Sequence, residues 1–281
     1  MRIAVTGSKG QLGTALQAEL LGHDLQLIDL PEHDITQLGA VRDLVCSFGP
    51  EVLIHAAALT DVEGCERDPE AAYRLNVLGT RNVAVAAQEC VAALVYISTD
   101  YVFDGRKSEP YWEYDDCSPV SVYSRTKWIG ERLVQQLCPR SYVVRVAWLY
   151  GQGPRNFVRT VLRLADERGR LQMVTDEVGS PTYATDVAAA LARLIREPAY
   201  GIYHLPNSGV CSRYEWAHEI LARTGRTRVE LTPSQNYQRL ARVPARAELR
   251  NFCGAEIGIS MRPWREALQA YLAANGLLVQ E

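Results

Sequence analysis

A tyrosine and a lysine stand four positions apart in the segment SVYSRTKWIGE, residues 121–131. The segment reads as a helix, and four residues advance a helix by about 400° and ~6 Å, so Tyr123 and Lys127 are expected on one face, one turn apart. A neighbouring ammonium lowers the pKa of a phenol, which ordinarily titrates near ~10. The spacing therefore predicts a tyrosine that acts as a general acid or base, the alternative being an aromatic side chain packed on a sheet beside a solvated lysine.

Hydroxyl and carboxylate side chains end the strand-like run VYISTD, which precedes this helix. Its last residues, Ser98, Thr99 and Asp100, are expected at the carboxyl edge of a parallel sheet, where ligands bind in doubly wound folds. A hydroxyl, a phenol and an ammonium would then converge beside a nicotinamide ring.

Three glycines in VTGSKGQLG follow the first strand-like run and precede the first helical pattern. Gly7 permits a tight turn, Gly10 lets a pyrophosphate approach backbone N–H groups, and Gly13 lets helix and strand pack closely. The alternative is a flexible turn between strand and helix. The position at the first strand–helix junction favours dinucleotide binding.

The second strand-like run, LQLID, ends at Asp29, where an acid accepts hydrogen bonds from an adenosine ribose. An acid there favours NADH because it repels a 2′-phosphate, whereas Lys9 in the glycine loop would attract that phosphate. Asp29 also reads as a simple turn residue, and Asp34 and Ile35 are expected to flank the adenine. The preference between NADPH and NADH stays open.

The elements that position these groups alternate along the first half of the chain, as short β-branched runs and helical patterns. This alternation predicts an α/β fold with a Rossmann-type doubly wound parallel sheet and a smaller α+β substrate-binding domain. We assign residues 1–150, plus about 175–200, to the dinucleotide-binding domain. The second domain is expected to comprise 151–174 and 201–281. Beyond about residue 150, helices are expected around 156–168, 184–196, 213–223 and 264–274. Helix starts are predicted at Asp68-Pro69 and at the Ser212–Glu215 capping box.

Charge and cysteine content narrow the class of protein. The 281 residues carry 30 Lys and Arg against 33 Asp and Glu, without a basic stripe, so nucleic acid is not expected as a partner. The seven cysteines are dispersed and odd in number, which argues against a disulfide framework and a zinc knuckle. With no signal peptide and no membrane-length apolar run, we expect a soluble cytoplasmic protein.

The motifs taken together resemble the extended short-chain dehydrogenase/reductase family, and within it the dTDP-4-dehydrorhamnose reductase branch. The similarity covers nearly the whole chain and rests on TGSKGQLG, HAAALTDVEGCERDPEAAYRLN, STDYVFDG with YSRTKWIGE, RVAWLYG and DEVGSPTYATDVA. It implies a catalytic set of Thr99, Tyr123 and Lys127. It implies cofactor contacts from Gly7, Lys9, Gly10, Gln11, Leu12, Gly13, Asp29, Asp34, Ile35, Ala56, Ala57, Ala58, Thr60, Tyr123 and Lys127. Substrate contacts are implied for Val62, Glu63, Thr99, Asp100, Tyr101, Trp148 and Asn156.

The reaction implied by the resemblance is reduction, with NADPH or NADH, of the C4 ketone of dTDP-4-dehydro-6-deoxy-L-mannose to dTDP-L-rhamnose. Lys127 would keep the pKa of Tyr123 depressed while Tyr123 donates a proton. Related dehydratases carry Asp-Glu after the threonine, but this chain has Asp100-Tyr101, which disfavours dehydration.

The sequence is also compatible with two alternatives. One is a reductase of another keto-deoxysugar nucleotide. The other is a non-catalytic NADP-binding subunit similar to the regulatory β subunit of methionine adenosyltransferase, whose partner would be another enzyme. The expected partner is a dTDP-linked keto-deoxysugar, and no membrane partner is expected. The oligomeric state stays open, although helices 69–89 and 122–137 are of the kind that pair in homodimers of similar enzymes.

Several further residues have two readings. Arg239, Arg242 and Arg246 are candidates to bind the diphosphate, or else surface charges, since the family's Arg-Pro is replaced by Val243-Pro244. Pro181 and Thr182 would shape the substrate cleft or form a plain turn. His55, Cys65 and Cys90 read as packed residues, and no metal site is expected.

Overall fold

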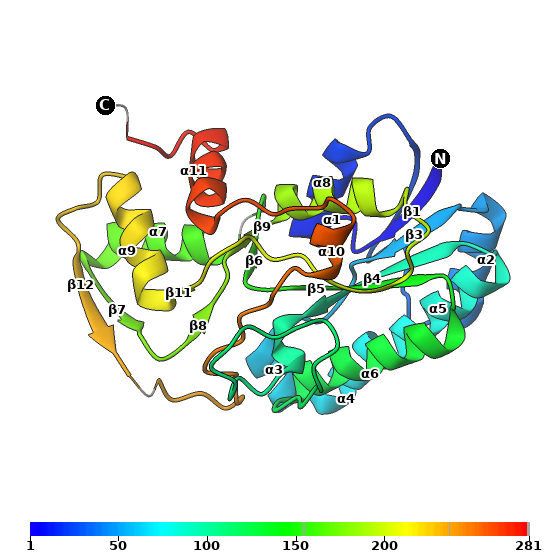
Figure 1. Ribbon diagram of the computed structural model, residues 1–281, viewed down its shortest axis with the longest axis horizontal. Helices are drawn as coiled ribbons and strands as arrows, with labels where there is room; N and C mark the ends of the chain where they lie inside the picture. The colour runs from blue at the N-terminus through cyan, green and yellow to red at the C-terminus, as the bar shows by residue number, and fades with distance from the viewer. Residues whose placement is uncertain (154, 236, 280–281) are drawn as a thin grey trace.

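A six-stranded parallel sheet forms the centre of the larger lobe in the computed structural model, which describes residues 1–153, 155–235 and 237–279 (Figure 1). The strand order is β10-β5-β4-β3-β1-β2, so the winding reverses between β1 and β3. The strands are β1 (Arg2–Thr6), β2 (Asp24–Ile28), β3 (Val52–His55), β4 (Ala93–Thr99), β5 (Ser141–Val146) and β10 (Gly201–His204). The predicted doubly wound parallel sheet is confirmed.

Helices cover both faces of this sheet because alternate strand residues point to opposite sides. Ile3 and Val5 pack in one core with residues of α1 and α8, while Ala4 packs in a second core with residues of α2, α5 and α6. Figure 1 shows α1 and α8 on one side of the sheet and α5 and α6 on the other. The bounds are α1 (Gln11–Glu19), α2 (Leu38–Phe48), α5 (Thr80–Glu89), α6 (Val122–Leu137) and α8 (Ala184–Leu194).

A short helical stretch precedes α5 and follows β3. It comprises α3 (Val62–Arg67), α4 (Pro69–Tyr73) and a π-helical turn, η1 (Arg74–Gly79). The Asp68 carboxylate accepts a hydrogen bond from the Ala71 amide at 3.0 Å, as predicted for a helix start at this point. A 3-10 turn, η2 (Asp100–Val102), follows β4 directly.

The smaller lobe has a hydrophobic core of its own, built around Tyr150, Trp216, Trp264 and Tyr271. Its helices are α7 (Phe157–Arg168), α9 (Arg213–Arg223) and α11 (Trp264–Ala274), near three of the predicted positions. The capping box of Ser212 and Glu215 starts α9, as predicted. The strands are β6 (Leu149–Tyr150), β7 (Arg170–Val174), β8 (Val178–Gly179), β9 (Thr182–Tyr183), β11 (Cys211–Ser212) and β12 (Glu230–Ser234).

One boundary of the predicted domain division is wrong. The second domain was expected to resume at residue 201, but β10 pairs with β5 in the large sheet, with Ile202 opposite Val143. The short helix α10 (Cys253–Glu256) contacts β10, and Ile259 belongs to the core beneath α1. The chain therefore stays in the larger lobe through β10 and returns to it once more at α10, which local patterns do not reveal. The remainder of the division stays a prediction.

The cysteines also depart from expectation, because a disulfide joins Cys46 in α2 to Cys90 at the end of α5. These two helices lie side by side on one face of the sheet, which brings residues 44 positions apart to a Cα–Cα distance of 5.5 Å. Cys90 is thus cross-linked rather than a packing residue, while Cys65 is free and buried as predicted. Among the described residues, no helix is both long and apolar enough to cross a membrane.

Candidate active site

A cleft of about 730 Å3 opens at the carboxyl edge of the sheet, where β1, β3 and β4 end and residues of the smaller lobe face them. It brings together most of the predicted site. The predicted residues that line it are Gly7, Lys9, Gly10, Gln11, Leu12, Gly13, Asp29, Asp34, Ile35, Ala56, Ala57, Ala58, Thr60, Val62, Thr99, Asp100, Tyr101, Tyr123, Lys127 and Trp148.

Two glycines of the loop, Gly7 and Gly13, stand where a side chain would not fit. Gly7 has φ +69°, and a Cβ there would lie 2.6 Å from the Ala57 amide nitrogen, while a Cβ on Gly13 would collide with the Gly7 carbonyl. Helix α1 begins at Gln11 after the extended Gly10, so its first N–H groups point into the cleft without intrahelical acceptors. Such an amide-lined helix start fits the pyrophosphate of a dinucleotide.

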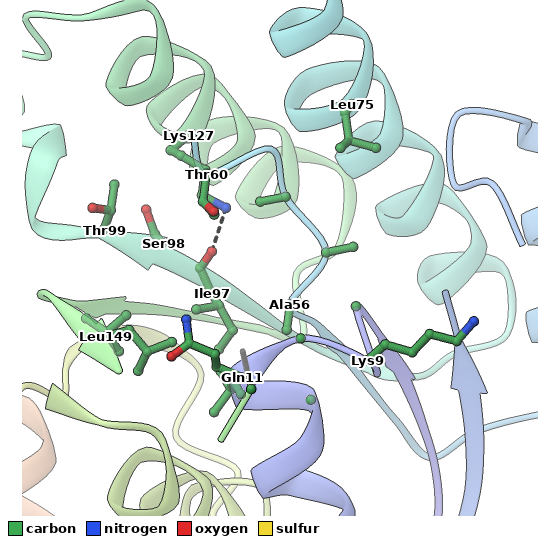
Figure 2. Close-up of a pocket in the computed structure, with 18 of the residues that line it drawn as sticks. Lys9, Gln11, Ala56, Thr60, Leu75, Ile97, Ser98, Thr99, Lys127 and Leu149 are labelled. Atoms are coloured by element: carbon green, nitrogen blue, oxygen red, sulfur yellow. Dashed lines mark hydrogen bonds between the residues drawn. The ribbon is translucent and has the colours of Figure 1, made fainter. Parts of the chain in front are cut away.

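At the end of the cleft near the glycine loop, Lys9 contacts two acids, Asp29 and Glu32. Asp29 accepts hydrogen bonds from the amides of Lys9 and Leu30, at 2.7 and 2.8 Å. The Lys9 ammonium donates to the Leu30 carbonyl at 2.8 Å and to Glu32 at 2.7 Å. Figure 2 shows Lys9 far from Thr99, across the width of the cleft.

The inner end of the cleft contains Lys127, which is only 3% exposed. Its ammonium donates to the Ile97 carbonyl at 2.7 Å, as Figure 2 shows, and lies 4.1 Å from the centre of the Tyr96 ring. Burial lowers the pKa of Lys127 to about 7, and the carboxylate of Glu131 opposes that fall. Lys127 is therefore close to half-protonated near neutral pH.

Tyr123 departs from the expected direction of titration. Burial raises its pKa well above the ordinary value, the charges of Asp100 and Tyr101 raise it further, and a hydrogen bond with the Thr99 hydroxyl partly opposes the rise. The prediction that Lys127 depresses this pKa is wrong, because loss of hydration is the largest influence on the phenol and raises its pKa. The phenol therefore keeps its proton at neutral pH, as a proton donor must.

Asp100 lies beside these groups with one oxygen engaged and one open. Thr99 donates to its Oδ1 at 3.0 Å, whereas its buried Oδ2 has no hydrogen-bond partner among the described residues. Burial raises the pKa of Asp100 to about 7, against the lowering effect of Thr99 and of the Arg213 charge. An unsatisfied buried oxygen in a cleft is suited to a ligand hydroxyl.

The smaller lobe contributes Trp148 and Arg213. Trp148 has φ 42°, a strained conformation for a residue with a side chain, and a Cβ on Gly179 would lie 2.5 Å from its indole ring. The Arg213 guanidinium stacks 3.5 Å from the Trp148 ring centre and lies 3.7 Å from Glu177. Sequence reasoning missed Arg213, although a cation at the first position of a helix, where the macrodipole disfavours it, is a signal of function.

Two predicted substrate contacts lie outside the cleft lining and have other partners. Glu63 accepts hydrogen bonds from the Leu240 and Ala241 amides, at 3.1 and 3.4 Å. Asn156 caps α7 and donates to the Tyr271 hydroxyl at 3.0 Å. Their positions indicate that they hold the smaller lobe together and against α3.

The arginines predicted for the diphosphate also lie outside the cleft lining. Arg239 donates to Glu177 at 2.7 Å, Arg246 donates to Glu248 at 2.6 Å, and Arg242 is exposed. The cation that does line the cleft from this lobe's helices is Arg213. Pro181 and Thr182 are buried beside the cleft rather than in it, and Thr182 donates to the Ser180 carbonyl.

His55 is a packed residue, as predicted. It is fully buried between the hydroxyls of Thr6 and Thr80, at 2.7 and 3.0 Å, and burial lowers its pKa to about 3. Within the part of the chain that the structure describes, no group of three or more His, Cys, Asp or Glu side chains is arranged to hold a metal ion.

Comparison with known proteins agrees with this geometry. A family model described as the RmlD substrate binding domain matches residues 1–276. The chain is 37% identical to the spore coat polysaccharide biosynthesis protein SpsK of Bacillus subtilis, over 96% of both chains. It is also 37% identical to a dTDP-4-dehydrorhamnose reductase of Aggregatibacter actinomycetemcomitans, over 95% of this chain and 97% of the relative. A dTDP-4-keto-6-deoxy-D-glucose reductase of Streptomyces niveus is 34% identical, over 98% of each chain.

Solved structures are similar over the same length. A dTDP-4-dehydrorhamnose reductase from Clostridium acetobutylicum superposes with a TM-score of 0.95 at 39% identity, covering 98% of this chain and all of the other. The enzyme of that name from Bacillus anthracis, solved in complex with NADP, superposes with a TM-score of 0.94 at 37% identity, covering 97% of this chain and 99% of the other.

Proposed function

The chain belongs to the RmlD substrate binding domain family, and from that premise we propose that it is a dTDP-4-dehydrorhamnose reductase. It reduces the C4 ketone of dTDP-4-dehydro-6-deoxy-L-mannose to dTDP-L-rhamnose, with NADPH or NADH. The observation that carries the proposal is the convergence of Thr99, Tyr123 and Lys127 at the inner end of a cleft whose other end is a glycine loop. The full-length reductases to which the chain is similar support it.

The residues of the cleft have distinct tasks in this reaction. The bound cofactor supplies the hydride. Tyr123, protonated because it is buried, donates its proton to the oxygen of the substrate carbonyl as negative charge develops there. The Thr99 hydroxyl orients that oxygen, and Lys127 holds the nicotinamide ribose. Because these groups are buried, their electrostatic interactions with the reacting oxygen are stronger than in water.

The rest of the substrate meets the smaller lobe. The open Oδ2 of Asp100 accepts a hydrogen bond from a sugar hydroxyl, and the stacked pair of Trp148 and Arg213 borders the nucleotide diphosphate. An arginine held by an indole face is pre-oriented for phosphate oxygens. We also propose that the protein acts in the cytoplasm as a homodimer through residues 69–89 and 122–137.

A second candidate function is supported by the Streptomyces niveus relative, named dTDP-4-keto-6-deoxy-D-glucose reductase. The same Tyr123 and Thr99 would serve a ketone of different sugar stereochemistry. The difference between the two functions lies in the substrate and not in the chemistry.

The test is an assay of NADPH and NADH oxidation with both keto-sugar nucleotides, with the product identified by NMR. The proposal expects oxidation with dTDP-4-dehydro-6-deoxy-L-mannose and a product with the L-rhamnose configuration. Faster oxidation with the D-glucose-configured ketone would favour the second candidate. No oxidation with any keto-sugar nucleotide, together with stable co-purification of a synthetase, would replace both with a regulatory subunit.

A further inference from the structure

Helix α6 carries a third polar residue on the face of the predicted acid–base pair. Glu131 follows Lys127 by four positions and Tyr123 by eight, so the three side chains lie along one side of the helix. Glu131 is only 2% exposed, and Arg145 on β5, beside it, is also 2% exposed. This buried ion pair lies behind the cleft rather than in its lining.

The Glu131 carboxylate is fixed by three hydrogen bonds from two residues. Arg145 donates to both of its oxygens, at 2.9 and 2.7 Å, and Ser98, which lines the cleft, donates at 2.5 Å. Arg145 in turn donates to the Glu113 carbonyl at 2.9 Å and to the Cys117 sulfur at 3.3 Å. A carboxylate that accepts this many hydrogen bonds cannot rotate away.

Three of the titratable groups near Lys127 carry no charge near neutral pH, and a fourth, Asp100, has its pKa raised by burial to about 7. His55 on β3 is neutral because burial lowers its pKa to about 3, and burial raises the pKa values of Tyr96 on β4 and Tyr123 on α6. A lysine buried among neutral groups loses its proton. Glu131 is therefore the negative charge that opposes this loss.

We propose that Glu131 is a positioning residue of the active site, whose fixed carboxylate keeps the ammonium of Lys127 charged one helical turn away. Arg145 and Ser98 hold that carboxylate in place. The inference rests on the proposed function for the task of Lys127 in holding the ribose. The effect of Glu131 on Lys127 does not depend on which sugar nucleotide is reduced.

The chain allows a direct measurement, because its only lysines are Lys9, Lys107 and Lys127. Lysine labelled with 13C and 15N gives three side-chain signals, and Lys9→Arg and Lys107→Arg variants assign them. The proposal expects the Lys127 signal of the unmodified protein to titrate with a midpoint near 7. In Glu131→Gln the midpoint is expected to fall by at least one pH unit, a tenfold change in the protonation equilibrium. In Glu131→Asp, which keeps the charge, it is expected to return most of the way.

A matched control separates this effect from general disturbance of the buried network. Glu113 is 1% exposed, its backbone carbonyl accepts a hydrogen bond from Arg145, and its carboxylate accepts hydrogen bonds from the amides of Phe252 and Cys253. Glu113→Gln removes an equally buried carboxyl group but is not on the face of α6. Its Lys127 midpoint is expected to match the unmodified protein.

Glu131→Gln leaves Arg145 buried without its partner, so a second variant guards against unfolding. Glu131→Gln with Arg145→Met removes both charges and is expected to fold and to show the lowered midpoint as well. An unchanged Lys127 midpoint in the folded double variant would overturn the inference, as would an equal fall in Glu113→Gln. Because the titration needs no substrate, this result is separable from failure of the reductase assay.

In the reductase assay, Glu131→Gln is expected to raise the KM for NADPH more than it lowers kcat. The increase in KM is expected to be largest above pH 7, because Lys127 of the variant has already lost most of its charge there. A loss of kcat that is independent of pH would indicate a structural role instead and count against the inference.

Discussion

The two ends of the cleft each contain a lysine, and their surroundings are opposite. Lys9, at the end near the glycine loop, has a side chain that is 58% exposed and is paired with Glu32, itself 60% exposed. Lys127, at the inner end, is 3% exposed and donates to the Ile97 carbonyl. The same side chain is a solvated charge in one place and a group near its titration midpoint in the other.

This difference shows how one cleft serves two purposes. At the solvent-exposed end near Lys9, ion pairs are screened and weak, so a substitution there is expected to change cofactor preference only slightly. At the buried inner end, desolvation shifts the pKa values of Lys127, Tyr123 and Asp100 far enough to change which of them are charged near neutral pH. Substitutions at the inner end are therefore expected to have larger effects than substitutions at the rim.

Tyr123→Phe is expected to give the largest effect. It removes the proton donor while keeping the ring, so kcat is expected to fall by ~10²–10⁴-fold with the dissociation constant for NADPH nearly unchanged. Steady-state assays and fluorescence titration with NADPH measure the two quantities.

The matched control is Tyr101→Phe, which removes a second phenol from the same cleft, with its ring 6.1 Å from that of Tyr123. We expect a change in substrate KM and a fall in kcat below tenfold. Equal loss of kcat in the two variants would mean that Tyr123 has no special role as proton donor.

The stability of Asp100→Asn, relative to that of the unmodified protein, is expected to increase as pH rises. Burial raises the Asp100 pKa from 3.8 to about 7, so its stabilising contribution is complete below about pH 4 and is lost as pH rises through 7. The asparagine does not ionise. The free energy of unfolding of the variant, relative to the unmodified protein, is therefore expected to gain on the order of 2–3 kcal/mol between pH 5 and pH 8.

Urea denaturation at the two pH values measures this gain. Asp24→Asn makes the same change on the exposed surface and is expected to stay within ~0.5 kcal/mol of the unmodified protein at both. If Asp100→Asn behaves like Asp24→Asn, the inner end of the cleft is not as dry as its burial indicates.

Arg213→Ala is expected to raise the substrate KM by about tenfold, with a smaller effect on the KM for NADPH, because it removes the cation stacked on Trp148. Arg265→Ala is the matched control, since Arg265 also stacks on a tryptophan of the smaller lobe, 4.4 Å from the Trp264 ring, but outside the cleft lining. A rise in KM for both variants, or for neither, would remove Arg213 from the substrate site.

Glu32→Gln is expected to give the smallest effect. It frees the Lys9 ammonium for a 2′-phosphate, so the ratio of kcat/KM with NADPH to that with NADH is expected to rise by about 2–5-fold. Glu51→Gln, an exposed acid directly before β3 at the opposite edge of the sheet, controls for the change in net charge. A rise of the same size in Glu51→Gln would assign the effect to net charge rather than to the Lys9 pair.

Much of the cofactor half was predictable because its signals are local. The spacing of Gly7, Gly10 and Gly13 and the four-residue separation of Tyr123 and Lys127 depend on a turn and on helical periodicity. The turn and the helical periodicity are each determined by a few consecutive residues. In the predicted substrate half, Glu63 and Asn156 lie outside the cleft lining and have other partners, because the smaller lobe is assembled from distant segments.

The amino-acid sequence by itself determined the alternation of strands and helices, the glycine loop and which polar side chains share a helical face, since these follow from backbone geometry over one or two turns. Tertiary structure alone decided that β10 returns to the large sheet, that Cys46 meets Cys90 and that Arg213 faces the cleft. It also decided the direction in which Tyr123 titrates. The physical reason is that desolvation depends on every segment packed around a group, and those segments are far apart in the chain.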